Sequence, residues 1–408
     1  MKCRHCHTPL KLSFLDLGSA PPSNAYLAAE DLKKPEKWYP LHILVCEKCF
    51  LVQTEDYAEA DELFSEDYAY FSSFSKSWLA HAEKFVETVQ KRFSLDADSH
   101  VVEIASNDGY LLQYVKERGI PCMGIEPTKS TAAAAREKGI ETREEFFGEA
   151  QAKKLAAEGK QADLTVANNV LAHVPDINDF IAGFAALLKE NGVACFEFPH
   201  LMRLVEFGQF DTVYHEHYSY LSLTAVEHVF AAGGLKIFDV EEWPTHGGSL
   251  RLYACRAESD THKMEKSVTE LLAQEKEAGM RAAEYYQGFQ KKADRIKNDF
   301  LDFLLTAGRM KKKVVGYGAA AKGNTLMNYA GVRPDLLPFV VDLNPAKQGK
   351  FLPGSRIPVA AEELLKTVRP DFVVILPWNL GVEIKEQLAY IRDWGGKFVT
   401  AVPELEIT

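Results

Sequence analysis

"VVEIASNDGYLL", residues 101–112, predicts the step on which the fold is built: a buried strand, a tight turn, and a helix that begins near Tyr110. Strands and helices then alternate, with the strands "PCMGIEP", "ADLTVANN" and "VACFEFP" separated by the helical segments "STAAAAREKG" and "INDFIAGFAALLKENG". Parallel strands need crossover helices of this kind. The pattern therefore predicts an α/β core with a parallel, doubly wound sheet.

The turn in this stretch is also a predicted cofactor site. It presents backbone N–H groups and a helix N-terminus, and the next strand ends at Glu126, whose carboxylate can accept hydrogen bonds from both hydroxyls of a ribose. A dinucleotide or S-adenosylmethionine would fit. The pyrophosphate of a dinucleotide favours glycines at alternate positions, but Ala105 and Asn107 take two of those places and only Gly109 remains. S-adenosylmethionine is the better fit; a purely structural turn would leave the acidic strand end without a use.

The polar and small residues around this turn, with a tyrosine from the aromatic segment before the core, form the expected cofactor set. Asn168 joins them because the C-terminal ends of parallel strands face the binding crevice of such sheets. The set is Glu103, Ala105, Asn107, Asp108, Gly109, Tyr110, Glu126, Pro127, Asn168 and Tyr68.

The rest of the chain divides into further parts. We expect an N-terminal domain at 1–70, the core at 71–257, long helices without proline at 258–307, and a smaller α/β domain at 308–408. In the last part, "VVGYGAAAKGN" could be a nicotinamide-binding fingerprint, although a lone glycine-rich turn is weak evidence. The same loop, with Lys322, equally suits the phosphates of another nucleotide.

Four of the seven cysteines form two C-x2-C pairs, Cys3 with Cys6 and Cys46 with Cys49. Paired knuckles of this kind predict one tetrahedral zinc ion. Disulfides are the alternative, and a cytoplasmic setting disfavours them. Four thiolates would close the coordination sphere, so the zinc would be structural. The other three cysteines lie singly in apolar stretches and are expected to be buried thiols.

Bulk properties narrow the functional class. The chain has 408 residues, 47% of them hydrophobic, and a net charge of −11. That charge argues against nucleic acid or an anionic membrane surface as the main partner. No apolar run is long enough for a membrane span, and the N-terminus lacks the apolar core of a signal peptide. A cytoplasmic enzyme is expected.

Several motifs occur together, in order, along the whole chain: the C-x2-C pairs with "LDLGSAPPSNAY" between them, "DYAYFSSFS", "VEIASNDGYLL", "NNVLAHVPD", "YHEHYSYLSL", "HGGSLR" and "YGAAAKGNT". This set resembles the sugar C-methyltransferases that modify nucleotide-linked deoxysugars. The resemblance implies three parts: a zinc-bearing N-terminal domain, a Rossmann-like methyltransferase core, and a smaller Rossmann-like C-terminal domain. It also implies a dTDP- or similar nucleotide-linked 4-keto-6-deoxysugar as substrate, between the middle and C-terminal domains. The layout permits a monomer.

The cluster Tyr214, Glu216 and His217 suits this chemistry. Adding a methyl group to carbon requires an enolate, which a base forms by removing a proton next to a ketone. A neutral histidine can be that base, a carboxylate can hold its other nitrogen, and a tyrosine can donate to the enolate oxygen. The resemblance places the family's catalytic residues at these positions, with His217 as base, and a second functional histidine at His173. A polar loop is the alternative, and His215 is the expected bystander.

Further residues are expected to contact the substrate. Glycines in "HGGSLR" would let backbone approach a ligand and its arginine could pair with a phosphate, although a hairpin bend with a solvated arginine fits as well. The set is Tyr70, Ser72, His246, Arg251, Lys322 and Asn324. An O- or N-methyltransferase on a similar sugar, or a nicotinamide-dependent sugar oxidoreductase, stay as alternative functions.

Overall fold

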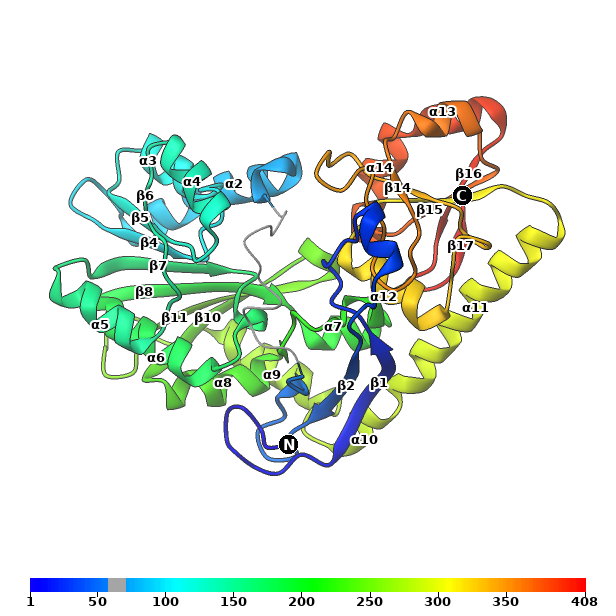
Figure 1. The fold of residues 1–408 in the computed structure, drawn as a ribbon. Coiled ribbons are helices and arrows are strands. Elements are labelled where there is room, and N and C mark those ends of the chain that lie inside the picture. Colours follow the sequence, from blue (N-terminus) through cyan, green and yellow to red (C-terminus); the bar gives the residue numbers. More distant parts are fainter. Residues whose placement is uncertain (58–70) are drawn as a thin grey trace.

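Three β-sheets organise the chain in the computed structural model, which describes residues 1–57 and 71–408 (Figure 1). The largest sheet forms one lobe, the C-terminal sheet forms the other, and the N-terminal sheet lies between them at the base. The long helix α11 (Phe289–Arg309) runs along the C-terminal lobe. Among the described helices, none combines the length and apolar character that a membrane crossing needs.

The core sheet has seven strands in the order β10-β11-β8-β7-β4-β5-β6. Its strands pair in parallel from β8 to β6, whereas β11 is antiparallel to β8 and β10. The strands are β4 (Val101–Ile104), β5 (Cys122–Ile125), β6 (Glu141–Arg143), β7 (Ala162–Asn168), β8 (Leu188–Pro199), β10 (Leu235–Trp243) and β11 (Ser249–Arg256).

Helices cover both faces of this sheet, as the doubly wound pattern predicts (Figure 1). On one face lie α2 (Lys76–Phe93), α3 (Leu112–Glu117) and α4 (Lys129–Glu137). On the other lie α5 (Glu149–Ala157), α6 (Ile177–Leu187) and α8 (Leu223–Ala232). Helix α3 begins two residues after Tyr110, later than expected, because Gly109 takes a left-handed backbone conformation (φ 73°) in the turn before it.

The C-terminal sheet repeats this plan on a smaller scale, in the order β14-β13-β12-β15-β16-β17. All neighbouring strands are parallel except β16 and β17. Its elements are β12 (Val314–Tyr317), α12 (Ala321–Ala330), β13 (Val340–Val341), β14 (Val359–Ala360), α13 (Leu364–Val368), β15 (Phe372–Ile375), α14 (Gly381–Gln387), β16 (Lys397–Thr400) and β17 (Glu406–Ile407).

The helices between the two lobes are α9 (Lys266–Glu277), α10 (Ala283–Gln287) and α11. Along α11 the buried residues include Phe289, Ile296, Phe300 and Leu304, which recur at helical spacing. The Phe289 ring stacks on Phe14 of the N-terminal sheet, with centroids 4.6 Å apart. This apolar face therefore ties the N-terminal sheet to the helix.

The N-terminal sheet contains β1 (Leu12–Ala20), β2 (Tyr39–Val45) and β3 (Val52–Thr54). Its fourth strand comes from far along the chain: β9 (Ser219–Tyr220) pairs with β3, which places Tyr220 opposite Val52. The Tyr214–His217 segment immediately precedes β9. The N-terminal sheet therefore anchors that segment.

Candidate active site and zinc centre

The four predicted zinc ligands meet at one point. The sulfur atoms of Cys3, Cys6, Cys46 and Cys49 all lie within 4.8 Å of one another. The Cys3 and Cys49 sulfurs are 3.6 Å apart, and those of Cys6 and Cys46 are 3.4 Å apart. Four sulfurs placed tetrahedrally about 2.3 Å from one zinc ion would be about 3.8 Å apart. The thiols are free of disulfides and fit a closed four-thiolate zinc site.

The two knuckles share one backbone conformation. In each, the residue after the second cysteine has a positive φ of 58°, and its N–H donates to the carbonyl of the first cysteine; these residues are His7 and Phe50. The turn directs both thiols of a knuckle to the same side. The neighbouring His5 is engaged elsewhere, because its Nδ1 lies 2.8 Å from Oδ1 of Asn178 in the core. His5 is therefore not one of the clustered ligands.

The predicted cofactor turn is folded around Glu126. One oxygen of its carboxylate accepts the N–H of Asn107 and the other accepts the N–H of Thr128, both at 2.9 Å. Burial raises the pKa of Glu126, and these two N–H donors oppose the rise. A Cβ at Gly109 would come within 2.5 Å of the Ile140 side chain, so this position requires glycine. The turn thus holds the Glu126 carboxylate in a fixed position beside Asn107.

Unsatisfied polar atoms lie behind the same turn. Glu103 is 0% exposed, and neither of its carboxylate oxygens has hydrogen-bond geometry to another described group. Burial raises its pKa well above the ordinary value, and the nearby Tyr110 hydroxyl opposes the rise. Nδ2 of Asn168 donates to the Tyr110 hydroxyl at 3.3 Å, while its Oδ1 and Oδ1 of Asp108 also lack a described partner. Acceptors of this kind fit the ammonium and ribose hydroxyls of S-adenosylmethionine.

The segment before α2 closes over this turn. The N–H of Ser72 donates to Oδ1 of Asn107 at 2.9 Å, and Lys138 donates to the Ser73 hydroxyl. The Trp78 ring stacks on Tyr110 with centroids 5.9 Å apart. Tyr68 is expected to contact the cofactor and Tyr70 the substrate, and both lie outside the described residues. Pro127, also in the expected cofactor set, is partly exposed beside Glu126.

The predicted base is held in one tautomer. The Nδ1 of His217 lies 2.9 Å from the Thr212 carbonyl, and the Nδ1 of His173 lies 2.8 Å from the Glu216 carbonyl. A carbonyl only accepts, so Nδ1 donates in both rings and Nε2 carries the lone pair when the ring is neutral. The centroids of the His173 and His217 rings are 4.6 Å apart, and the centroid of the Tyr214 ring lies 4.0 Å from that of His217.

Both histidines are neutral at physiological pH. Burial lowers the pKa of His173 to about 4. Burial, and then the neighbouring His173, lower the pKa of His217 well below 6.5. The geometry therefore supplies two neutral imidazoles side by side, each with a basic Nε2.

Glu216 differs from the expectation that it would hold the base. Residues 214–217 form a tight turn closed by the His217 N–H on the Tyr214 carbonyl, and the stretch is not extended. The Glu216 side chain consequently leaves the imidazole and accepts from the amide of Asn24 in the N-terminal domain at 3.1 Å. It is 1% exposed, its Oε2 has no described partner, and burial raises its pKa. The backbone carbonyl of Thr212 fulfils the role expected of this carboxylate.

His215 points away from the predicted base, as expected of a bystander. Its Nε2 lies 3.3 and 3.2 Å from the carbonyls of Tyr39 and Pro40, at the start of β2. Burial lowers its pKa. Its contacts fix the turn on the N-terminal sheet.

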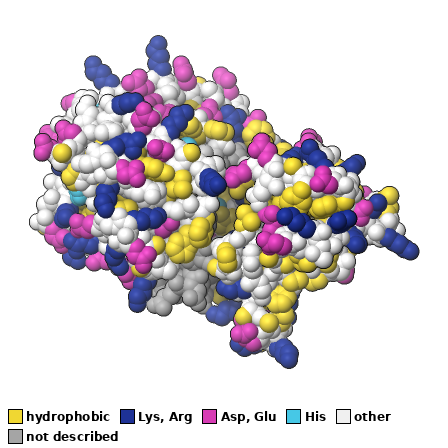
Figure 2. Space-filling model, turned by 90° about the horizontal axis from the view of Figure 1, so that it is seen from above, with side chains coloured by type: hydrophobic (Ala, Val, Ile, Leu, Met, Phe, Trp, Pro, Cys, Tyr) yellow, Lys and Arg dark blue, Asp and Glu magenta, His cyan; other side chains and the backbone are white. Residues whose placement is uncertain are grey.

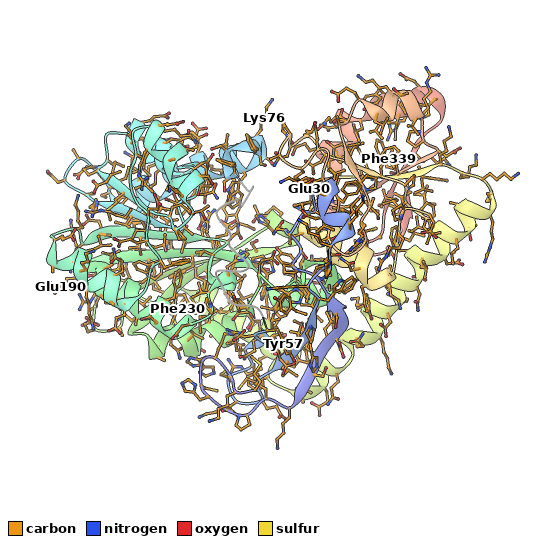
Figure 3. The ribbon with its side chains drawn as sticks, viewed as in Figure 1. Glu30, Tyr57, Lys76, Glu190, Phe230 and Phe339 are labelled. Carbon is orange, nitrogen blue, oxygen red and sulfur yellow. The ribbon has the colours of Figure 1, made fainter. Side chains whose placement is uncertain are left out.

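A cavity of about 540 Å³ separates the two lobes. Its walls come from the N-terminal domain, the segment before α2, Glu216, and the loops at the C-terminal edge of the C-terminal sheet. Figure 2 shows the furrow between the lobes, with hydrophobic side chains gathered along it. Glu30 on the short helix η1 (Ala29–Lys33) and Lys76 at the start of α2 lie on either side of this opening (Figure 3). The cavity is large enough for an extended small molecule.

The C-terminal wall of the cavity contains a second acidic strand end. Asp342 follows β13, and its carboxylate accepts the N–H of Ala319 at 2.7 Å. Lys347 lies beside it, donates to the Ala319 carbonyl at 2.8 Å, and is the one cationic side chain among the described residues that line the cavity. Sequence reasoning missed Lys347, although a lysine five residues after an acidic strand end in "VVDLNPAK" was a usable signal.

Lys322 lies at a different place from the one expected. It does not line the cavity wall beside Asp342; its Nζ donates to Oδ1 of Asn379 at 2.7 Å and lies 4.4 Å from the centre of the Trp378 ring. Asn324, two residues further along α12, is 1% exposed, and neither polar atom of its side-chain amide has a described partner. Ser72 lines the cavity, and its contact with the substrate stays a prediction.

Arg251 is not at the cavity. It is 2% exposed, lies opposite Glu197 on the neighbouring strand, and pairs with it at 2.6 Å. His81 approaches the same carboxylate at 2.9 Å. Burial would raise the pKa of Glu197, but the His81 hydrogen bond and the Arg251 charge outweigh it and lower the pKa to about 2. Because its charge is already matched internally, Arg251 is poorly placed to bind a phosphate.

His246 lies between this buried group and the active site. Its backbone is left-handed (φ 56°), and its ring meets the edge of Trp78 at 5.2 Å. Burial and the charge of Lys322 lower its pKa to about 4. A neutral His246 is therefore close to both Lys322 and the aromatic side chain that covers the cofactor turn.

Comparison with known proteins agrees with this arrangement. Three family models match in order: a zinc binding domain at residues 3–64, a methyltransferase domain at 78–240 and a C-methyltransferase C-terminal domain at 244–403. The C-methyltransferase NovU from Streptomyces niveus is 33% identical over 403 residues, covering 99% of this chain and 96% of the relative.

Solved structures with some likeness are more distant. A protein from Pyrococcus horikoshii is 15% identical with a TM-score of 0.39, covering 49% of this chain and 100% of that one. Magnesium protoporphyrin IX methyltransferase from Synechocystis, solved with S-adenosylhomocysteine, is 14% identical with a TM-score of 0.35, covering 44% of this chain and 82% of that one.

Proposed function

Because the chain belongs to the zinc-containing, S-adenosylmethionine-dependent C-methyltransferases, we propose that it methylates a ring carbon next to the ketone of a nucleotide-linked 4-keto-6-deoxysugar. The observation that carries this proposal is the fixed tautomer of His217, whose Nδ1 is held by a backbone carbonyl. A neutral imidazole with a basic Nε2 is what proton removal beside a ketone requires. The adjacent Glu216 lines the cavity between the lobes.

The chemistry begins with proton removal. His217 takes the proton from the carbon beside the ketone; the C–H electron pair becomes the C=C bond, and the carbonyl π pair moves to oxygen. Tyr214, whose ring lies against His217, donates a hydrogen bond to that oxygen. Bound S-adenosylmethionine would supply a methyl group on a positively charged sulfur: the C=C electron pair would form the new C–C bond, the C–S bond would break with its pair left on sulfur, and the ketone would re-form. His217 later returns its proton to solvent.

The nucleotide half of the substrate would occupy the C-terminal side of the cavity. Asp342 offers an acceptor for a sugar hydroxyl, as acidic strand ends do in parallel sheets. Lys347 offers a positive charge to a diphosphate. Both residues line the cavity. A dTDP group is the proposed occupant.

Proton exchange tests the proposal without a methyl donor. In deuterated water, the zinc-loaded enzyme with dTDP-4-keto-6-deoxyglucose and S-adenosylhomocysteine should place deuterium on a carbon beside the ketone, measured by NMR against an enzyme-free control. H217N keeps shape and hydrogen bonding but loses basicity, so exchange should slow by about 10²–10⁴-fold. H215N is the matched control and should slow exchange much less than H217N, because His215 supports the turn but points away from the base. Wild-type enzyme that places no deuterium in the sugar would refute the proposal.

The same assay decides between the two neighbouring histidines. If H173N loses exchange while H217N keeps it, the base is His173. Both rings hold Nδ1 on a carbonyl, so each has the tautomer that a base needs.

A further inference from the structure

Helix α12 carries Lys322 close to the segment that contains His217. One helical turn along the same helix, the Thr325 hydroxyl donates to the Val213 carbonyl at 2.9 Å, immediately before the turn that contains Tyr214 and His217. Helix α12 therefore docks directly on the catalytic segment, and Lys322 lies at the end of the helix that meets it.

A second connection fixes Lys322 at the same place. Its ammonium lies over the Trp378 ring, and the indole N–H of Trp378 donates to Oδ2 of Asp211 at 2.8 Å. Asp211 is 0% exposed and precedes Thr212, whose carbonyl holds His217. One face of the Trp378 ring thus positions a cation, while its edge is bonded to the segment that positions the base.

Among the described residues, Asn379 is the one hydrogen-bond acceptor of this ammonium. An ammonium group has three N–H donors, so donors are left for an oxygen of a bound molecule. In the proposed function, Lys347 binds the diphosphate of the substrate, because it is the cation on the C-terminal wall of the cavity. Lys322 is therefore not needed for that contact.

We propose that the Lys322 ammonium stabilises the enolate oxygen that forms on the substrate ketone when His217 removes the neighbouring proton. This inference rests on the proposed function. The negative charge that moves to oxygen in that step is met by a fixed positive charge, the usual way in which a buried site lowers the barrier to enolate formation. No proton leaves Lys322 in the step; the proton stays on His217.

The electrostatics agree with this position. Burial and His173 dominate the lowered pKa of His217, and the charge of Lys322 contributes to it. Burial lowers the pKa of Lys322 itself to about 8, against the opposing charge of Asp211. The ammonium is therefore charged at neutral pH and close enough to His217 for its charge to lower the pKa of that imidazole.

The test compares Lys322→Met, Lys322→Arg and Lys366→Met in the exchange assay. Lys366→Met is the matched control, because that exposed lysine of the same domain also lies over an aromatic ring, at 5.0 Å from Tyr390. K322M should slow exchange by about 10²–10³-fold, the usual loss on removing one oxyanion donor. K322R keeps a cation and should retain part of the rate, and K366M should exchange as the wild type does.

Binding separates this role from phosphate contact. Calorimetry with dTDP should give K322M the wild-type affinity, whereas Lys347→Met should bind dTDP more weakly. Thermal unfolding of K322M establishes that the variant is folded, and K322R repeats the comparison if it is not. Wild-type exchange by K322M, or a loss of exchange matched by an equal loss of dTDP affinity, would overturn the inference. Failure of the wild type to exchange would instead overturn the proposed function.

Discussion

Glu126 and Asp342 occupy equivalent positions in two different parallel sheets. Each follows the strand beside the first strand of its sheet, β5 or β13. Each carboxylate accepts the N–H of a residue in the turn after that first strand, Asn107 or Ala319. It also accepts the N–H of the residue two positions after the acidic residue itself, Thr128 or Asn344. Each lobe thus has an acidic strand end whose carboxylate is held by the same pair of backbone N–H contacts.

This equivalence predicts a reciprocal pattern of binding. E126Q removes the charge and places an amide N–H₂ against a backbone N–H, so S-adenosylmethionine should bind about 1–3 kcal/mol more weakly. D342N should weaken dTDP and leave S-adenosylmethionine affinity unchanged. Calorimetry of both variants with both ligands checks this. If E126Q binds S-adenosylmethionine normally, the ribose is held elsewhere.

Proton exchange should depend on pH through two groups. His217 must be neutral, and burial and His173 lower its pKa, so the rate should fall only well below pH 6.5. Lys322 must be charged, so the rate should fall as pH rises through about 8. Asp211, whose pKa burial raises to about 6, and His246, at about 4, also face this lysine.

A pH profile of exchange that extends well below pH 6.5 and well above pH 8 measures both limbs. K322M should keep the acidic limb and lose the alkaline one. An unchanged alkaline limb in K322M would assign that limb to another group.

Loss of Arg251 should destabilise the fold. R251M leaves the buried Glu197 carboxylate without its main cation, which costs about 3–5 kcal/mol for a broken buried pair. Arg203→Met, which removes an arginine paired with two exposed glutamates, is the control and should cost about 0–1 kcal/mol. Urea unfolding measures both.

The same pair predicts how stability depends on pH. The folded-state pKa of Glu197 is lowered from 4.5 to about 2, so its contribution is present above pH 4.5 and is lost as pH falls towards 2. R251M should show a smaller loss, because the His81 hydrogen bond to Glu197 remains. Equal stability of R251M and the wild type at pH 7 would contradict both expectations.

Zinc should be needed for folding. Purified enzyme should contain about one zinc ion per chain, and C46S should lose it and unfold at a lower temperature. Cys122→Ser, outside the cluster, should keep its zinc. Plasma mass spectrometry and thermal unfolding check both. A C46S enzyme with full zinc and an unchanged melting temperature would contradict the assignment of Cys46 as a ligand.

Local patterns in the sequence were sufficient for several of these features. The alternation of strands and helices predicts both parallel sheets, because crossover helices are needed to connect parallel strands. The spacing of Cys3, Cys6, Cys46 and Cys49 predicts the zinc cluster, because each knuckle is a short turn whose two thiols must lie close together. The acidic end of β5 at Glu126 is predicted by the same kind of local rule.

Contacts between distant residues could not be predicted in this way. The support of His217 by a backbone carbonyl depends on the tight turn at 214–217, and Glu216 meets Asn24 across 192 positions of sequence. The burial of Arg251 depends on the register between β8 and β11, which places it opposite Glu197. None of these pairings leaves a periodic pattern, so an arginine near two glycines looked like a phosphate ligand.

The pairing of β9 with β3 has a consequence for recombination between related enzymes. The Thr54 hydroxyl on β3 donates to the His217 carbonyl at 2.5 Å, so a strand of the metal-bearing domain directly supports the turn at 214–217. Chimeras cut between the N-terminal domain and the core would join halves that evolved separate versions of one small sheet. Exchanging residues 12–54 together with 210–220 would keep that sheet within one parent. The part of this enzyme that should be exchanged as a whole therefore consists of two segments that are far apart in the sequence.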